Sequence, residues 1–574
     1  MKKNVLALSI AAMIGGLGFV GAASASVIVG QDRTGATDVS AVTVAAGKML
    51  APTVTGFQLA EGGVGHALVI PYYTVQGDNA TILHLVNTDT KNGKVAKIRF
   101  RGAANSDDVL DFQVLLSPGD VWTAAVTKGD NGFAQLVTAD NTCSIPAFEK
   151  DVPVSFLDGR LNPNLKDDAL ANQTREGYVE IFNSADIPGG KFYGKDNDAN
   201  SALYTATKHV AGKAPCTASV IQSALYDTDF TPAEEGAAVK LGLDAPTGGL
   251  TGDWYIMNVP NTTTYSGAAT ALVGQGGKVG NFVAFPQNDT IKIATPEKFT
   301  ADPSLVSKGF AGTTKDVTGK WLTADETKAA VIEAIALDFP DLSTPYYAPA
   351  AAQAAIDQAA NLTQALAVSS ITNQYAKDAS IIAKTDWVFS MPTRRYSVAL
   401  DYSKQTATTP AARVFTAVTG TGTPNTVALP GTGSATVTGA KQFFYTGNTK
   451  VVDGKVCVDT QGTVFRDREE TFKSGVPVFS PSSAKSARMC GEANVLSFGE
   501  GLTAASVLGA SVAREDVSAA ALFENGWGVM DTTNGGVGLP ILGYSVQKLT
   551  NPQASAGVSG NFGITWAHRF TKVN

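Results

Sequence analysis

Apolar and polar residues alternate through residues 67–126, in short runs that are separated by turns. The run 95–101 is a clear case, because apolar residues occupy every second position and Lys or Arg stands between them. A period of two is typical of a strand with one buried face and one polar face. With 95–101, the runs at 67–74, 80–87, 109–116 and 120–126, which are rich in β-branched and aromatic residues and bounded by turns, give five predicted strands. Five strands joined by short turns predict an Ig-like β-sandwich rather than a parallel sheet with helical crossovers.

The pattern changes to a helical one in residues 321–378. Residues 348–376 are rich in Ala and Gln, and their apolar positions recur every three to four residues. That spacing places apolar side chains on one helix face. The positions in question are Ile356, Ala359, Leu362 and Leu366. We expect packing helices that are inserted into a β protein.

The first 25 residues have a third kind of pattern. Lys2 and Lys3 precede an apolar run that several glycines interrupt, and residues 23–25 (Ala-Ser-Ala) fit the site that a signal peptidase reads. The glycines make the run a poor membrane-spanning helix. We therefore expect residues 1–25 to be a cleaved secretory signal and the mature protein to be exported.

These patterns divide the chain into four parts. The signal peptide (1–25) is followed by a β-sandwich region (26–320), a helical insert (321–378) and a β-rich C-terminal region (379–574). The expected fold is mainly β, with Ig-like β-sandwich domains and an inserted α-helical segment. Whether the β segments before and after the insert share one sheet stays open.

The net charge of the chain limits which binding partners are expected. The formal net charge is −7, and loss of Lys2 and Lys3 makes the mature chain more negative by two. Nucleic acid is excluded as an expected partner, because phosphate binding needs concentrated Lys and Arg. Only 17% of residues are charged and 58 are Gly, which suits extended β structure with many turns.

The four cysteines are expected to form disulfides, because the exported chain meets an oxidising compartment. They are Cys143, Cys216, Cys457 and Cys490. A zinc site is disfavoured, since no two cysteines have the close spacing of zinc ligands. Of the three pairings that four cysteines permit, the local one is favoured: Cys143 with Cys216, and Cys457 with Cys490.

One loop carries a candidate metal site. Asp196, Asp198 and Asn200 resemble the opening of a calcium loop, but the glycine and glutamate that an EF-hand needs further on are missing. An irregular calcium site and a solvated polar loop are the two interpretations, and calcium is the one cofactor considered.

Two charged clusters are expected on the surface. Asp107 and Asp108 are expected to face solvent in a turn. Arg394 and Arg395 follow a Pro-Thr pair and precede a strand, and are expected as a charge pair at a sheet edge, where charge opposes unwanted strand pairing.

No catalytic residue is predicted. The chain lacks an H-E-x-x-H helix and a G-x-S-x-G nucleophile elbow, and it has only four histidines. Tryptophans could line a sugar-binding groove, but most lie in predicted strands, where a core position is the expected role. The residues considered are Trp122, Trp254, Trp387, Trp527 and Trp566.

Three stretches carry a resemblance: residues 99–126, residues 383–396, and the ending that includes Gly538-Leu539-Pro540 and residues 559–569. They resemble a group of exported proteins of Gram-negative bacteria described as cell-surface or surface-layer-like proteins. The resemblance implies surface display and self-assembly, and it brings no catalytic residues.

The expected function is a structural cell-surface protein, a self-assembling, surface-layer-like subunit and not an enzyme. It is expected on the outer face of the outer membrane, with further copies of itself as the main partner and the membrane surface or lipopolysaccharide as another. An outer-membrane β-barrel of the porin type and a secreted carbohydrate-binding protein are the alternatives.

Overall fold

The structure is a computed structural model that describes most of the chain, and it is mainly β. The described residues are 26–31, 48–189, 201–226, 235–284, 340–347, 352–402, 405–406, 408–415, 424–429, 433–438, 443–445, 447–474, 488–498, 506–517, 523–534, 537–555 and 558–572. The predicted signal peptide lies outside them. None of the helices in these ranges has the length and apolar character needed to cross a membrane.

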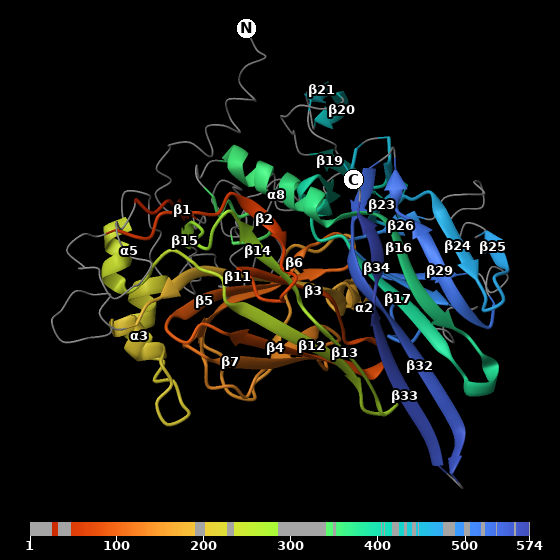
Figure 1. The fold of residues 1–574 in the computed structure, drawn as a ribbon, viewed down its shortest axis with the longest axis horizontal. Helices are drawn as coiled ribbons and strands as arrows, with labels where there is room; N and C mark the ends of the chain where they lie inside the picture. Colours follow the sequence, from red (N-terminus) through yellow and green to blue (C-terminus); the bar gives the residue numbers. More distant parts are fainter. Residues whose placement is uncertain are drawn as a thin grey trace.

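Two antiparallel sheets form an N-terminal sandwich (Figure 1). One sheet has the order β2 (Gly56–Leu59), β14 (Thr270–Gln275), β3 (Ala67–Thr74), β11 (Glu176–Ile187), β5 (Gly93–Gly102), β6 (Asp108–Leu116) and β9 (Cys143–Ile145). The other has the order β10 (Val154–Ser155), β8 (Ala134–Val137), β7 (Val121–Lys128), β4 (Asn79–Asn87), β12 (Leu250–Asn258) and β13 (Thr263–Ala268). The five strands predicted from the sequence are β3 to β7, and the prediction of a mainly β, sandwich-rich fold is confirmed.

Two further sheets form the C-terminal part (Figure 1). One has the order β28 (Arg514–Val517), β27 (Ala493–Phe498), β17 (Lys384–Ser390), β32 (Leu542–Ser555) and β33 (Val558–Ala567). The other has the order β25 (Phe472–Ser474), β24 (Gly462–Arg466), β29 (Asn525–Asp531), β16 (Ala367–Ala376), β31 (Val537–Pro540) and β30 (Thr533–Asn534), and β34 (Arg569–Lys572) also pairs with β16.

Smaller elements surround these sheets. The short sheets pair β1 (Ser26–Ile28) with β15 (Phe282–Ala284), β18 (Val398–Asp401) with β19 (Ala412–Phe415), and β20 (Pro424–Leu429) with β21 (Gly433–Thr438), and join β22 (Thr449–Val452), β23 (Lys455–Asp459) and β26 (Arg488–Cys490). In the described ranges the α-helices are α2 (Asp167–Asn172), α3 (Ala202–Thr207), α4 (Ala218–Ile221), α5 (Glu235–Leu241) and α8 (Ala352–Leu366).

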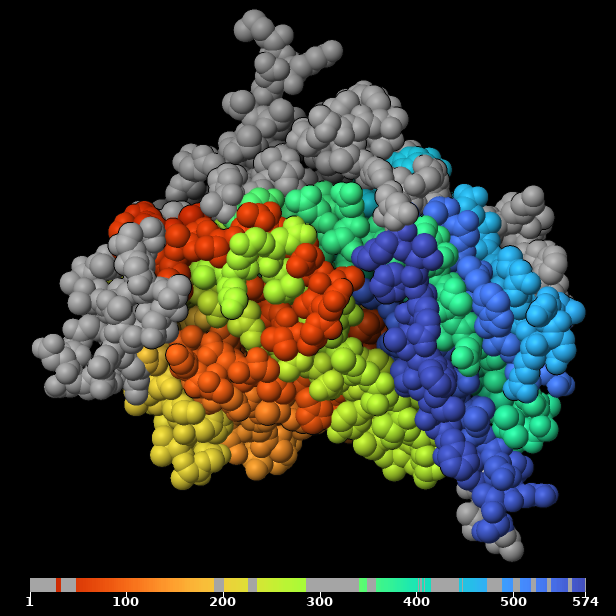
Figure 2. All heavy atoms as spheres, in the orientation of Figure 1, coloured from red at the N-terminus to blue at the C-terminus, as the bar shows by residue number. Residues whose placement is uncertain are grey.

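The five-stranded sheet is the layer that joins the two halves. Tyr544 and Val546 on one face pack into the core of the N-terminal sandwich. Trp387 and Phe498 on the other face pack against the seven-stranded C-terminal sheet. Within the described ranges, no strand before the insert pairs with a strand after it. The two β regions therefore have separate sheets and a common core, and they lie side by side as one body (Figure 2).

The helical insert is shorter than predicted. Helix α8 ends at Leu366, and its predicted apolar positions Ala359, Leu362 and Leu366 are buried. Residues 367–376, expected as helix, are instead strand β16. The sequence turns β-branched after Leu366, with Val-Ser-Ser-Ile-Thr at 368–372, and strands β29 and β34 give both edges of this segment hydrogen-bond partners. The parts of the predicted insert at 321–339 and 348–351 lie outside the described residues.

Candidate functional site

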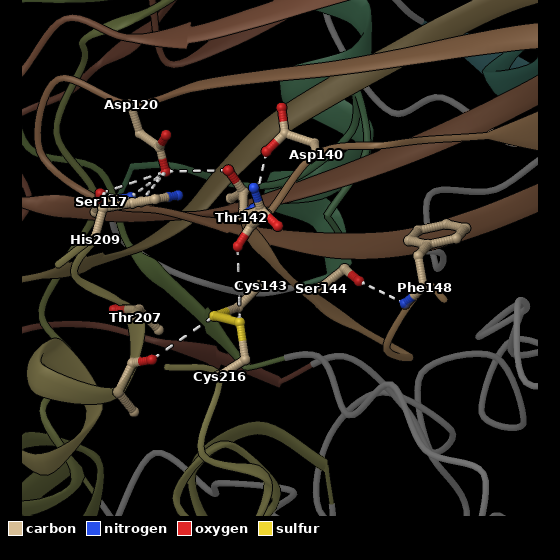
Figure 3. The surroundings of a disulfide bond; sticks show 12 residues. Ser117, Asp120, Asp140, Thr142, Cys143, Ser144, Phe148, Thr207, His209 and Cys216 are labelled. Carbon is tan, nitrogen blue, oxygen red and sulfur yellow. Dashed lines mark hydrogen bonds and ion pairs between the residues drawn. A yellow bond between two sulfur atoms is a disulfide. The ribbon is translucent and has the colours of Figure 1, made fainter. Parts of the chain in front are cut away.

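Two disulfides link elements that are distant in the sequence. Cys143 on β9 is bonded to Cys216, which lies between α3 and α4, 73 residues later (Figure 3). Cys457 on β23 is bonded to Cys490, its register partner on β26. These are the two local pairs that the sequence favours. Closing loops of this length stabilises a fold by roughly 4 kcal/mol each in the chain-entropy account.

A serine, a histidine and an aspartate meet beside the first disulfide (Figure 3). Ser117 Oγ lies 3.1 Å from His209 Nδ1, and Asp120 Oδ2 lies 3.4 Å from the same nitrogen. A catalytic triad needs the serine and the carboxylate on opposite ring nitrogens. Asp120 Oδ2 also accepts a hydrogen bond from the Thr142 hydroxyl at 3.3 Å, so the group ties the 117–120 turn to the strand that carries Cys143. Its geometry is that of a structural contact.

The candidate calcium residues Asp196, Asp198 and Asn200 lie outside the described residues. In the part of the chain that the structure describes, no group of three or more His, Cys, Asp and Glu side chains is placed to hold a metal ion.

A buried charge cluster lies on the face of the N-terminal seven-stranded sheet that points away from the sandwich core. Its members are at most 5% exposed: Lys97, Arg99, Arg101, Asp107, Asp108, Asp111, Glu180, Asp341, Arg394, Arg395 and Glu492. The expectation that Asp107 and Asp108 face solvent is wrong, and so is that of an exposed pair at Arg394 and Arg395. The reason is that later parts of the chain cover this face of the sheet.

The ion pairs of the cluster connect the N-terminal seven-stranded sheet to the later chain segments that lie over it. Arg101 Nε on β5 donates to Glu180 Oε2 on β11 at 3.0 Å, and Arg101 Nη2 lies 3.5 Å from Asp341 Oδ2. Arg395 Nη1 donates to the same Asp341 oxygen at 3.3 Å. Asp341 therefore links β5 to the 3₁₀ turn Arg394–Tyr396 across a long sequence separation.

Glu492 makes a second link. Its Oε2 accepts from Arg394 Nε at 2.9 Å, and its Oε1 accepts from the backbone N–H of Arg395 at 2.9 Å. The backbone N–H of Glu492 donates to the carbonyl of Ala103 at 2.8 Å, at the end of β5. The C-terminal region is thus bonded directly to the N-terminal sheet.

Burial dominates the titration of this cluster. It lowers the pKa of Lys97 to about 7, against the opposing pull of the Asp111 carboxylate. It raises the pKa of Glu180 and of Glu492, although an arginine beside each works in the other direction. All these groups are buried, and their ion pairs connect the N-terminal sheet to the C-terminal region.

An open groove of about 980 Å³ lies at the base of the β32–β33 hairpin. Its lining comes from β16, β24, β29, β32, β33 and β34, and it includes Gln374, Arg466, Arg468, Trp527, Gln547, Trp566 and Arg569. We refer to it as the tryptophan groove. A concave site of this size with aromatic and polar lining is typical of small-ligand binding.

One wall of the tryptophan groove is the outer face of the seven-stranded C-terminal sheet. Trp527 on β29 is the register partner of both Arg466 on β24 and Gln374 on β16, so the three side chains form a row on one face. Phe465 and Tyr375, the neighbours of Arg466 and Gln374 in sequence, are buried in the core on the opposite face. The Arg466 guanidinium lies over the Trp527 ring, 5.8 Å from its centre.

The other wall is the hairpin. Trp566 on β33 is the register partner of Ser545 on β32, which is the partner of Trp387 on β17. Trp387 and Trp566 therefore share a face, but Trp387 is buried and Trp566, at the sheet edge, is 40% exposed. The Asn373 side-chain amide donates to the Trp566 carbonyl at 3.2 Å, which fixes the hairpin to β16.

The structure separates the tryptophans into two classes. Trp122, Trp254 and Trp387 are core residues, as expected, and are at most 2% exposed. Trp527 and Trp566 are 37% and 40% exposed and line the groove.

The polar lining was not singled out from the sequence. Gln374 was assigned to a helix, and Arg466 and Arg569 lie far apart in the chain. The one local signal is Gly526-Trp527-Gly528. A side chain on Gly528 would lie 2.7 Å from the Phe465 ring, so the inner position must stay small while the tryptophan faces outward.

Comparisons with known proteins identify no family for this chain. No protein-family model matches the chain, and no curated protein matches it.

Proposed function

We propose that this protein is an exported structural subunit of the cell surface that associates with further copies of itself in a surface layer. The signal-like segment 1–25 supports export. The two disulfides suit an oxidising compartment outside the cytoplasm. The resemblance of residues 99–126 and 383–396 to surface-layer-like proteins supports display on the outer face of the outer membrane, where lipopolysaccharide would be the neighbouring surface.

The observation that carries the proposal is the β32–β33 hairpin, which extends beyond the rest of the body (Figure 1). Strand β32 pairs with β17 only as far as Lys548, and residues 551–555 are exposed. The sandwich contacts the hairpin as far out as Asn561, the register partner of Thr550, since Asn561 Nδ2 donates to the Asn261 carbonyl at 2.8 Å. We call the part beyond Lys548 the hairpin tip.

The hairpin tip has the properties of an association element. An isolated two-stranded hairpin is at best marginally stable in water, and its unpaired edges are templates for further strands. Phe562 is 57% exposed and pairs with Leu549 on the same face, so the two side chains form a small apolar patch there. The matching tip of a second copy offers a strand edge to pair with and apolar side chains that would cover this patch.

Electron microscopy of the producing cell tests the proposal. We expect an ordered array on the surface that disappears when the gene is deleted and returns with the wild-type gene. A variant gene that encodes Phe562→Asp should restore export but not the array. An unchanged surface in the deletion strain would contradict the proposal.

A further inference from the structure

We propose that the tryptophan groove binds an acidic saccharide, a short oligosaccharide that carries carboxylate or phosphate groups. The proposal goes beyond self-association, because the groove lies at the hairpin base and the association face at the tip. It rests on three properties of the groove: its aromatic walls, its polar floor and its charge.

The aromatic walls are Trp527 and Trp566, which come from two different sheets. Both rings remain more than one-third exposed although each strand also has a buried face available. Exposed apolar side chains that gather in one place can mark a binding groove. Two such rings in one groove offer flat apolar surfaces for the faces of sugar rings, which present C–H groups.

The floor between the walls is polar. Gln374 stands beside Trp527 in the same row, and Thr372 lies two residues along β16 on the same face. Asn525 and Gln547 also belong to the lining. Side-chain amides and hydroxyls both donate and accept hydrogen bonds, as sugar hydroxyls do.

Three arginines give the groove its charge preference. Arg569 pairs in register with Thr372 and is exposed, Arg466 lies over Trp527, and Arg468 lies on the turn after β24. A guanidinium binds carboxylates and phosphates in a bidentate geometry that neutral sugars do not offer.

The acidic residues of the lining offset only part of this charge. Asp467 Oδ1 accepts from the backbone N–H of Glu469 and of Thr471, each at 2.9 Å, and its Oδ2 accepts from the Thr471 hydroxyl. These bonds lower the pKa of Asp467, so its carboxylate stays ionised and is hydrogen-bonded within its own loop. Glu470 is the other acid in the lining, so the arginines exceed the acids. The net negative charge of the whole chain disfavours long polyanions, which is why we infer a short ligand.

Binding of defined sugars to the purified full-length mature protein tests the inference. The probes are an oligogalacturonate and a neutral maltooligosaccharide of equal length, with a short single-stranded DNA as a third probe, followed by calorimetry and tryptophan fluorescence. We expect saturable binding of the oligogalacturonate, with weaker binding of the neutral sugar and of the DNA. Comparable binding of all three probes, or binding of the neutral sugar or the DNA alone, would overturn the assignment to an acidic saccharide.

Variants locate the site. Trp527→Ala, Trp566→Ala and Arg569→Gln should each weaken oligogalacturonate binding by about tenfold or more. Phe570→Ala and Lys213→Gln, which also remove exposed groups, should not change it. Near-ultraviolet circular dichroism establishes that each variant is folded, and Trp527→Phe should retain most of the binding if Trp527→Ala does not fold. Unchanged binding in all three groove variants would overturn the inference.

A hairpin-tip variant keeps this result separate from the proposed function. Phe562→Asp should reduce self-association and leave oligogalacturonate binding unchanged. Lost association with intact binding would support the separation of the two surfaces. Intact association without any sugar binding would refute the assignment of the groove to saccharide binding and leave the proposed self-association standing.

Discussion

The aromatic rings of Trp254 and Tyr544 lie 4.4 Å apart with an angle of 32° between their planes, and both side chains are buried. Trp254 belongs to β12 of the N-terminal sandwich and Tyr544 to β32 of the five-stranded sheet. This contact sits where the two halves share their core. It also lies on the strand whose far end forms the hairpin tip, so the core of the sandwich anchors the proposed association element.

Replacement of Tyr544 tests the common core. Tyr544→Ala should lower the free energy of unfolding by about 3–5 kcal/mol, because it removes a buried ring from between two sheets. Tyr544→Phe is the matched control, since the hydroxyl is buried without a hydrogen-bond partner in the described structure and its loss should cost little. Urea denaturation measures both. Equal losses in the two variants would contradict the packing role of the ring.

The buried Arg394–Glu492 ion pair predicts that the effects of replacing the two residues on the free energy of unfolding are strongly coupled. Arg394→Met alone should cost about 3–5 kcal/mol, because it leaves the Glu492 carboxylate buried without its ion-pair partner. The double variant Arg394→Met with Glu492→Met should recover much of that loss, since no charge is then left buried at this point. A double-mutant cycle on the free energy of unfolding measures the coupling, and strictly additive effects would exclude it.

Asp386 predicts that stability decreases as the pH rises through mild acid. Burial raises the pKa of Asp386 to about 6, although Ser506 and Leu508 donate hydrogen bonds to it. The folded state therefore binds a proton that the unfolded state has already lost. Between pH 4 and 6.5 this residue should reduce the free energy of unfolding by about 2 kcal/mol.

The neutral variant Asp386→Asn isolates this contribution. Its curve of stability against pH, subtracted from that of the wild type, should contain the decrease between pH 4 and 6.5. A flat difference would show that Asp386 titrates normally in the fold.

His568 predicts the opposite slope in the same pH range. Its Nε2–H donates to the Val388 carbonyl at 2.8 Å and its Nδ1 accepts from the Asn373 amide at 2.9 Å, so the neutral ring is fully bonded. A proton on Nδ1 would face another donor, and burial lowers the pKa of His568 to about 3. The unfolded state thus binds the proton first as the pH falls below about 6.5.

His568 should therefore contribute stability above pH 6.5 that is lost towards pH 3, by about 3–4 kcal/mol at pH 3.5. Unfolding of His568→Gln measured over this range should have a shallower acid loss than the wild type. Parallel curves for the two proteins would contradict the prediction.

Local pattern was enough to predict the strands of the N-terminal sandwich but not what covers them. The alternation in 95–101 correctly places Ile98 and Phe100 in the core. It also suggests that Lys97 and Arg99 face water, yet both are fully buried. Asp108 and Asp111 on the neighbouring strand form buried ion pairs with these charges. The next charged residue on this face, Arg101, is paired with Asp341, more than 200 positions away, which no local pattern contains.

The candidate groove was predictable only in part for a similar reason. Exposed and buried tryptophans have the same strand-like neighbours in the sequence, so Trp387 and Trp566 could not be told apart. The difference is that one strand is central in its sheet and the other is at the edge. Gln374 was missed because an Ala- and Gln-rich segment favours helix until strands β29 and β34 supply its backbone partners.

Sedimentation velocity of the purified mature protein over a range of concentrations, with and without calcium, tests self-association through the hairpin tip most directly. The wild type should form larger species as its concentration rises. Phe562→Asp should weaken association about tenfold or more, whereas Val210→Asp, which places the same charge at another exposed apolar residue, should not. A wild-type protein that stays monomeric at high concentration in both conditions, or a Phe562→Asp variant that associates as the wild type does, would contradict the account.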